Sequence, residues 1–156
     1  MKIIVLAGGL STERDVSLSS AAGICRTLVE KGHDAFLLDV FMGLENAPEN
    51  LEDVFTLPDH GLEIVKNIST EEPDLEAVKA SRPDQSDCFF GPNVIELCRL
   101  ADITFLGLHG GEGENGKLQA SFDLLGIKYT GPDSLGCAVA MHKGVAKQIF
   151  LESGVD

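Results

Sequence analysis

The sequence predicts an α/β fold whose open, mostly parallel sheet is covered by helices on both faces. Short apolar runs at 2–7, 35–40 and 103–108 are typical of strands that are buried on both sides. Apolar residues at helical spacing follow the first run at 17–31 and the third run at 116–125. Strands that alternate with helices in this way favour a three-layer, Rossmann-like arrangement.

The first strand–helix–strand unit has the clearest pattern. The run at 2–7 closes on Gly8-Gly9, and the helix predicted at 17–31 stops before Gly32. Glycine at that position suits the left-handed residue that commonly ends a helix. With the strand predicted at 35–40, this unit is expected to have a right-handed crossover.

The pattern fades between residues 41 and 91 and then returns. In the faint stretch, which holds most of the prolines, only 62–65 suggests a strand, as part of a small hairpin. Gly91-Pro92 predicts the start of a helix over 93–98, with proline at or near its first position. The remaining elements are predicted at 116–125 (ended by Gly126), 128–130 and 134–153, the last with a break near Lys143-Gly144.

The composition is that of one globular domain with an acidic surface. Of 156 residues, 44% are apolar and 24% charged, and the net charge is −13. Such a surface repels nucleic acid and anionic lipid, so we expect neither as a partner. The first apolar run is too short for a signal peptide, and no run approaches the length of a membrane span. We therefore expect a cytoplasmic protein.

The four cysteines are scattered along the chain. None stands in a C-x-x-C spacing, which argues against a disulfide framework or a metal site. The histidines His33, His60 and His142 show no ligand pattern either, and we interpret them as surface residues.

The loop after the first predicted strand combines a glycine pair with charged residues. It lacks the G-x-G-x-x-G dinucleotide fingerprint. Glycines let the backbone approach a ligand closely, and the helix start behind them offers free amides to an anion. Because the Glu13 carboxylate can take an ammonium, and stands beside Arg14, this loop suits a zwitterion. The alternative is that Glu13, Asp15 and Ser17 only cap and charge the helix.

The loop after the third predicted strand is even richer in glycine. Residues 109–116 contain four glycines and two glutamates, with His109 as the only basic side chain. A phosphate cradle needs lysine and no acids, so this loop suits a cationic group better than a phosphate. The alternative is a plain glycine-rich connection.

Lys143 and Lys147 lie one helical turn apart near the end of the chain. Such a pair either forms a solvated helix face or points a cation at nucleotide phosphates.

Four ordered motifs together resemble the D-alanine–D-alanine ligases. Their N-terminal motif is similar to Gly8-Gly9-x-Ser11-x-Glu13-Arg14-x-Val16-Ser17, and their second signature to His109-Gly110-x-x-Gly113-Glu114-Asn115-Gly116-x-Leu118-Gln119. The stretches that follow resemble Gly126-Ile127-x-Tyr129-Thr130-Gly131 and Ala138-x-Ala140-Met141-x-Lys143. The resemblance covers about 1–40 and 101–155, which makes 41–91 a variable insertion within the family.

The resemblance implies that residues 1–156 form the N-terminal, pre-ATP-grasp domain of an ATP-grasp enzyme. Such ligases use ATP, with Mg²⁺ or Mn²⁺, to phosphorylate the carboxylate of one D-alanine. The amine of a second D-alanine then attacks the acyl phosphate, and the dipeptide feeds peptidoglycan synthesis. The ATP-grasp subdomains and metal ligands would lie beyond residue 156. We therefore expect the chain alone to bind no cofactor, to form no dipeptide and to expose a partly apolar surface toward the missing domains.

The resemblance also implies roles for particular residues. Glu13, as the catalytic residue, would hold the ammonium of the first D-alanine, and His109 would lie near the carboxylate of that substrate. The backbone around Val16 and Ser17 would help to enclose this substrate. The implied roles of the remaining site residues are support of the site for Glu114 and contact with the nucleotide for Lys143. A homodimer is implied as well.

The chain departs from the family pattern at two places. His142 stands where the family usually has an aspartate before the lysine, and Pro132-Asp133 replaces a commoner pair of small residues. A helix cap at the first place and the turn at the second are therefore expected to differ.

Three other interpretations are weighed against the ligase domain. The first is a stand-alone, non-catalytic domain that binds a small amino acid. The second is a ligase whose second substrate is D-lactate or D-serine. A nucleotide-binding oxidoreductase domain is the third, and the missing fingerprint disfavours it.

Overall fold

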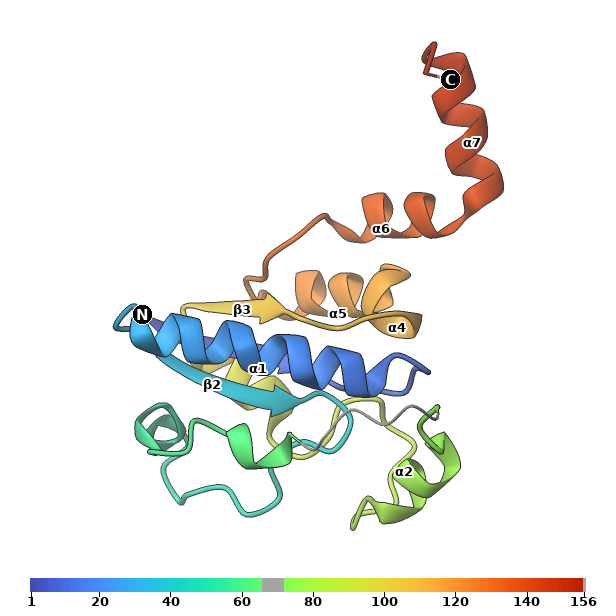
Figure 1. The fold of residues 1–156 in the computed structure, drawn as a ribbon. Coiled ribbons are helices and arrows are strands. Elements are labelled where there is room, and N and C mark those ends of the chain that lie inside the picture. The colour runs from blue at the N-terminus through green and yellow to red at the C-terminus, as the bar shows by residue number, and fades with distance from the viewer. Residues whose placement is uncertain (66–71, 156) are drawn as a thin grey trace.

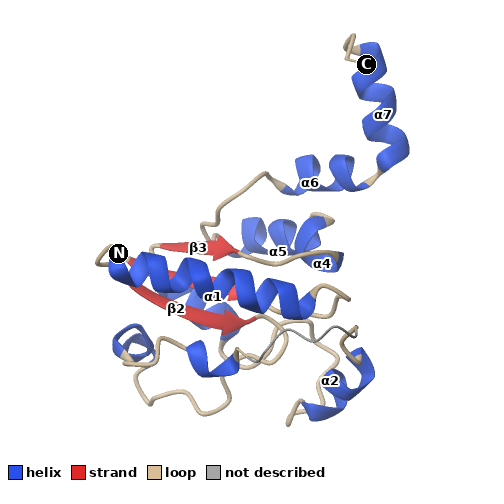
Figure 2. Cartoon of the chain, viewed as in Figure 1, coloured by secondary structure: helices blue, strands red, loops and turns tan. Residues whose placement is uncertain are grey.

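A three-stranded parallel sheet forms the centre of the protein. The computed structural model describes residues 1–65 and 72–155. The strands are β1 (Lys2–Ala7), β2 (Asp34–Asp39) and β3 (Ile103–Leu106), in the order β2-β1-β3 (Figures 1 and 2). Both neighbours pair with β1 in parallel, so all three carboxyl ends lie at one edge of the sheet.

Helices cover both faces of this sheet, which confirms the predicted three-layer α/β arrangement. Alternate residues of β1 point to opposite faces, as the pleat of a strand requires. Val5 packs with α1 (Arg14–Glu30), whereas Ile4 packs with α3 (Val94–Leu100) and α5 (Lys117–Leu125). Two buried apolar clusters, one on each side of the strands, therefore make up the core.

The helix boundaries follow the sequence pattern with small shifts. The first helix begins at Arg14, three residues before the predicted start, and Gly32 beyond its end has a φ of +83°. The predicted end of α5 is confirmed, because Gly126 is its C-cap residue with a φ of +68°. The helix predicted after Gly91-Pro92 is confirmed as α3, which begins at Val94, with Pro92 two residues before its first position.

The hairpin strand predicted at 62–65 is wrong. Leu62–Ile64 forms a short 3-10 helix, η2, beside the outer edge of β2. The His60 carbonyl accepts the Leu37 N–H at 2.9 Å, and a Cβ on Gly61 would lie 2.2 Å from the Leu37 carbonyl oxygen. The chain thus contacts the edge of β2 through a tight turn at His60-Gly61 and then enters η2 in place of a paired strand.

The stretch 41–91 contains two further elements within its described part. These are the 3-10 helix η1 (Leu51–Thr56), whose Val54 and Phe55 are buried in the core, and α2 (Leu75–Ser81). The strand predicted at 128–130 is reduced to one parallel bridge between Thr104 and Tyr129.

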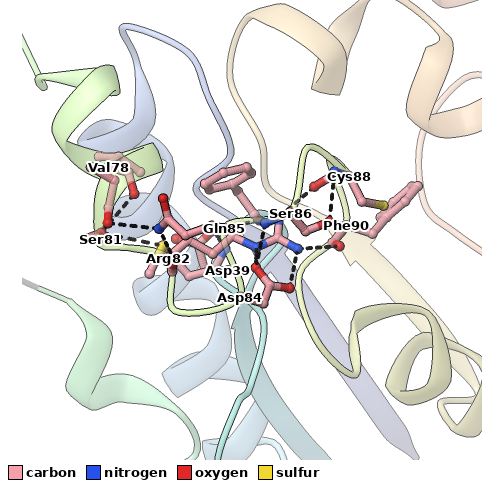
Figure 3. Close-up of polar contacts among 12 residues, drawn as sticks. Asp39, Val78, Ser81, Arg82, Asp84, Gln85, Ser86, Cys88 and Phe90 are labelled. Carbon is pink, nitrogen blue, oxygen red and sulfur yellow. Dashed lines mark hydrogen bonds and ion pairs between the residues drawn. The ribbon is translucent and has the colours of Figure 1, made fainter.

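Arg82 anchors the second half of this stretch (Figure 3). Its side chain is only 2% exposed, and its guanidinium donates to the carbonyls of Cys88 at 2.5 Å and Phe90 at 3.2 Å. It also pairs with Asp84, where hydrogen bonding from the guanidinium lowers the pKa of the carboxyl. The guanidinium carbon lies 4.8 Å from the centre of the Phe41 ring, a cation–π distance. One arginine thus ties residues 82–90 to the end of the sheet.

The break predicted near Lys143 is confirmed at the C-terminal end. It separates α6 (Ser134–Met141) from α7 (Lys143–Glu152), which stands away from the sheet in Figure 1. His142 caps α7, because its Nδ1 accepts the Val145 N–H at 3.3 Å. Histidine thus takes the capping position at which the sequence departs from the pattern that it otherwise resembles.

The last two helices expose a large part of their apolar side chains, in agreement with the expected apolar surface. The exposed large apolar residues of this region are Leu135, Met141, Val145, Ile149, Phe150, Leu151 and Val155.

Replacing Arg82 with alanine should destabilise the fold, although Arg82 is not part of the sheet. The change removes charge-assisted hydrogen bonds to two carbonyls, so we expect a loss of about 2–3 kcal/mol in the free energy of unfolding. Urea unfolding measures it. Lys79→Ala is the control, because it removes only an exposed ion pair on α2 and should cost less than about 0.5 kcal/mol. Equal losses in the two variants would show that Arg82 is not an anchor.

Candidate functional site

Two glycine-rich loops meet at the carboxyl edge of the sheet. The first follows β1 and contains residues 8–13, and the second follows β3 and contains residues 107–116. The Ser11 hydroxyl of the first loop donates to the His109 carbonyl of the second at 2.6 Å. The parallel pairing of β1 with β3 therefore brings together residues that are about a hundred positions apart in the sequence.

Ser17 locks the two strand ends to each other. Its hydroxyl accepts the Gly8 N–H at 3.0 Å and donates to the Gly107 carbonyl at 2.8 Å. The residue is fully buried in the first turns of α1. The hydroxyl thus both donates and accepts a hydrogen bond inside the protein, so a ligand can contact only the residues around Ser17 and not its hydroxyl.

The Glu13 carboxylate lies over the second loop. Glu13 is the N-cap residue of α1 and is exposed, and its side chain makes no capping hydrogen bond. A Cβ placed on Gly110 would lie 2.8 Å from Glu13 Oε2, so the glycine leaves room for the carboxylate. The hydrogen-bonding part of the helix-cap interpretation is therefore not seen at Glu13, although its negative charge does lie at the N-terminus of α1.

His109 and Val16 lie beside this carboxylate. Glu13, Val16 and Ser20 share one face of α1, since they are three and four residues apart. His109 Nε2 lies 3.2 Å from the Ser20 hydroxyl, and Val16 is 47% exposed. The site thus offers a carboxylate, an imidazole and an apolar side chain on one open surface.

Glu114 faces a different hollow. It ends α4 (Gly111–Glu114) and lines a pocket of about 340 Å³ together with Leu108, Gln119 and Met141. Burial raises the pKa of the Cys137 thiol, and the charges of Asp133 and Glu114 raise it further. Neither Glu13 nor His109 lines this pocket.

Lys143 is also remote from that surface. It is the first residue of α7, is exposed, and forms no ion pair with any residue that the structure describes. Lys147 is exposed one turn further along the same helix.

Sequence reasoning missed the buried ion pair behind the first loop. Arg14 donates to the Gly9 carbonyl at 2.7 Å and pairs with the Asp39 carboxylate. Asp39 also accepts the N–H groups of Phe41 at 2.9 Å and Met42 at 3.1 Å. The only signal in the sequence is a single acid at the end of an apolar strand, and it does not reveal its partner.

The other histidines and the cysteines offer no second site of a recognised ligand pattern in the described part of the chain. His60, predicted at the surface, is half-buried with its Nδ1 3.2 Å from the Ala35 carbonyl, and His33 is half-buried as well. All four cysteines are unpaired, and burial raises the pKa of Cys25 to about 11. Over residues 1–65 and 72–155, no cluster of three metal-ligating side chains is found. In that same part of the chain, no helix is long and apolar enough to cross a membrane.

An open parallel sheet with two loops meeting at its carboxyl edge defines the Rossmann-like class of α/β domains, in which ligands typically bind at that edge. The family model described as D-ala D-ala ligase N-terminus matches residues 2–132, and the chain belongs to this family. This confirms the resemblance read from the motifs. The match also runs through 41–91, where the motifs alone showed no likeness.

Curated relatives and solved structures agree with this assignment. The chain is 48% identical over 160 residues to a D-alanine–D-alanine ligase of Pediococcus pentosaceus and 45% identical over 155 residues to one of Lacticaseibacillus casei. It covers 99% of its own length in both alignments but only 44% and 43% of the relatives. The chain therefore spans less than half the length of these ligases.

Two solved structures share the fold. A D-alanine–D-alanine ligase of Coxiella burnetii gives a TM-score of 0.59 at 25% identity, over 99% of this chain and 42% of that one. A ligase of Bacillus anthracis complexed with ATP gives a TM-score of 0.60 at 22% identity, over 99% of this chain and 35% of that one.

The glycine pair at the first loop should be irreplaceable because of close packing as well as backbone angle. A Cβ on Gly8 (φ +73°) would lie 2.5 Å from the Asp39 carboxylate, whereas one on Gly126 (φ +68°) meets nothing within 4 Å. We expect Gly126→Ala to cost about 1 kcal/mol and Gly8→Ala at least about 2 kcal/mol more in unfolding free energy. Similar costs, measured by urea unfolding, would contradict the close approach at Gly8.

Proposed function

We propose that this chain is the substrate-binding N-terminal domain of an ATP-dependent D-alanine–D-alanine ligase. In the proposed reaction, ATP phosphorylates the carboxylate of one D-alanine, and the amine of a second D-alanine displaces the phosphate to form a dipeptide for peptidoglycan. The observation that carries the proposal is the exposed Glu13 carboxylate above Gly110, beside His109 and at the carboxyl edge of the sheet. Family membership supports it.

The geometry suits the ammonium end of an amino acid. Among residues 1–65 and 72–155, the Glu13 carboxylate has neither a cation partner nor a capping hydrogen bond, so a substrate ammonium suits it as a counter-charge. The imidazole of His109 can donate a hydrogen bond to the substrate carboxylate. Val16 then contacts the small apolar side chain, and the backbone around Ser17 closes the site from behind.

The described residues support binding of a nucleotide or a metal ion less than they support binding of an amino acid. Lys143 and Lys147 present two cations on one side of α7, which suits contact with ATP phosphates. The described residues offer no set of ligands for Mg²⁺ or Mn²⁺. We therefore assign to this chain the binding and orientation of the first D-alanine. Glu114 is assigned a supporting role at the neighbouring pocket. The choice of the second substrate is assigned to no residue of this chain. A homodimer and a cytoplasmic location belong to the same proposal.

D-alanine should drive phosphate release from ATP in the full-length gene product, and L-alanine should not. Glu13→Gln keeps the shape of the side chain but removes its charge, and losing a charge-assisted hydrogen bond costs about 1.5–3 kcal/mol. We therefore expect kcat/KM for D-alanine to fall about 10- to 100-fold. Glu30→Gln, at the far end of the same helix, is the matched control and should leave the rate unchanged.

The result that contradicts this proposal is equally definite. A phosphate-release rate that D-alanine does not change would refute the ligase function. A Glu13→Gln variant as active as the Glu30→Gln control would refute the role of Glu13.

The 156-residue chain by itself should form no dipeptide. It places no metal-ligating cluster and no phosphate cradle around the proposed substrate site in its described part. We expect incubation with ATP, Mg²⁺ and D-alanine, followed by mass spectrometry, to yield no D-alanyl-D-alanine above the level of a protein-free control. Dipeptide formation by the purified chain would show that the catalytic groups lie within these residues.

A further inference from the structure

A buried ion pair lies directly behind the proposed substrate site. The side chains of Arg14 and Asp39 are 10% and 4% exposed, and the pocket that both line does not include Glu13 or His109 among its lining residues. Burying two charges costs free energy unless hydrogen bonds satisfy them, and removing one partner leaves the other uncompensated. Here both charges make several hydrogen bonds, and these bonds hold particular segments of the backbone in place.

Asp39 collects donors from three separate segments. Its Oδ1 accepts N–H groups from Phe41 at 2.9 Å, Met42 at 3.1 Å and Gly9 at 3.4 Å, while Oδ2 pairs with Arg14. The carboxylate also packs so closely against Gly8 that no side chain fits there. One carboxylate at the end of β2 thus sets the position of the glycine turn that follows β1.

Arg14 connects this carboxylate to the start of α1. Its guanidinium donates both to Asp39 and to the Gly9 carbonyl, so it links β2, the glycine turn and the helix. Glu13 precedes it directly, and neighbouring residues of a helix point about 100° apart. With Arg14 turned inward, the adjacent Glu13 side chain lies outward over Gly110.

We propose that Arg14 and Asp39 are positioning residues for amino-acid binding: they hold the Gly8-Gly9 turn and aim the Glu13 carboxylate without touching the substrate. The inference rests on the proposed function for the identity of the ligand. Its structural half, the placement of Glu13 by the ion pair, stands apart from that function and can be measured separately.

Two variants separate positioning from simple stability. Arg14→Lys keeps the positive charge, but a single ammonium cannot reproduce the two-directional fork of the guanidinium. The double variant Arg14→Gln with Asp39→Asn removes both charges together, so no unpaired charge stays buried. Lys79→Gln, which breaks an exposed ion pair on α2, is the control.

The structural arm uses NMR on the 156-residue chain. We expect an NOE between the Glu13 side chain and the Gly110 α protons in the wild type and the control. It should weaken in Arg14→Lys and vanish in the double variant, while amide exchange at Phe41 accelerates at least tenfold. A double variant that retains both the NOE and the slow Phe41 exchange overturns the proposal. If the double variant does not fold, the folded Arg14→Lys variant decides in the same way.

The kinetic arm uses the full-length gene product. Loss of positioning should raise the KM for the first D-alanine more than tenfold in the double variant and less in Arg14→Lys, with the folded fraction unchanged. A purely structural role would lower the maximal rate in proportion to the folded fraction and leave KM as it was, and that result overturns the proposal. A wild-type enzyme inert toward D-alanine refutes the proposed function instead, and the NMR arm then decides the placement of Glu13.

Discussion

A small number of buried polar groups hold the carboxyl ends of the three parallel strands together, and the candidate site depends on them. The Asp39 carboxylate ends β2 and receives hydrogen bonds from the glycine turn after β1, and the Ser17 hydroxyl joins that turn to the end of β3. These contacts are buried, where an unmet polar group is costly. The exposed Glu13 and the half-buried His109 stand on the two loops that this buried frame holds together.

The sequence predicts this frame only in part. The three strands and the helices α1 and α5 follow from apolar runs and glycine stops, because local periodicity and burial coincide there. The strand predicted from the short apolar run at 62–65 was wrong, since a pattern of four residues cannot distinguish a strand from a turn beside a strand edge. The partnership of Arg14 with Asp39 could not be foreseen, because the topology and not the local pattern brings residues 25 positions apart into contact.

The sequence also predicts the candidate site only in part. Motifs identified Glu13 and His109, and the parallel pairing of β1 with β3 places their loops in contact. The same motifs grouped Glu114 and Lys143 with them, whereas the structure places Glu114 at a separate pocket and Lys143 on a projecting helix. The chain spans less than half the length of its curated relatives, and the ligand contacts of these two residues stay predictions.

The most direct test of the account is the position of a bound D-alanine. It requires a crystal structure of the full-length gene product with D-alanine and a non-hydrolysable ATP analogue. The account predicts the ammonium nitrogen within about 2.7–3.2 Å of the Glu13 carboxylate, with the Arg14–Asp39 pair intact behind it. An ammonium held by other groups, with Glu13 left facing solvent, would contradict it.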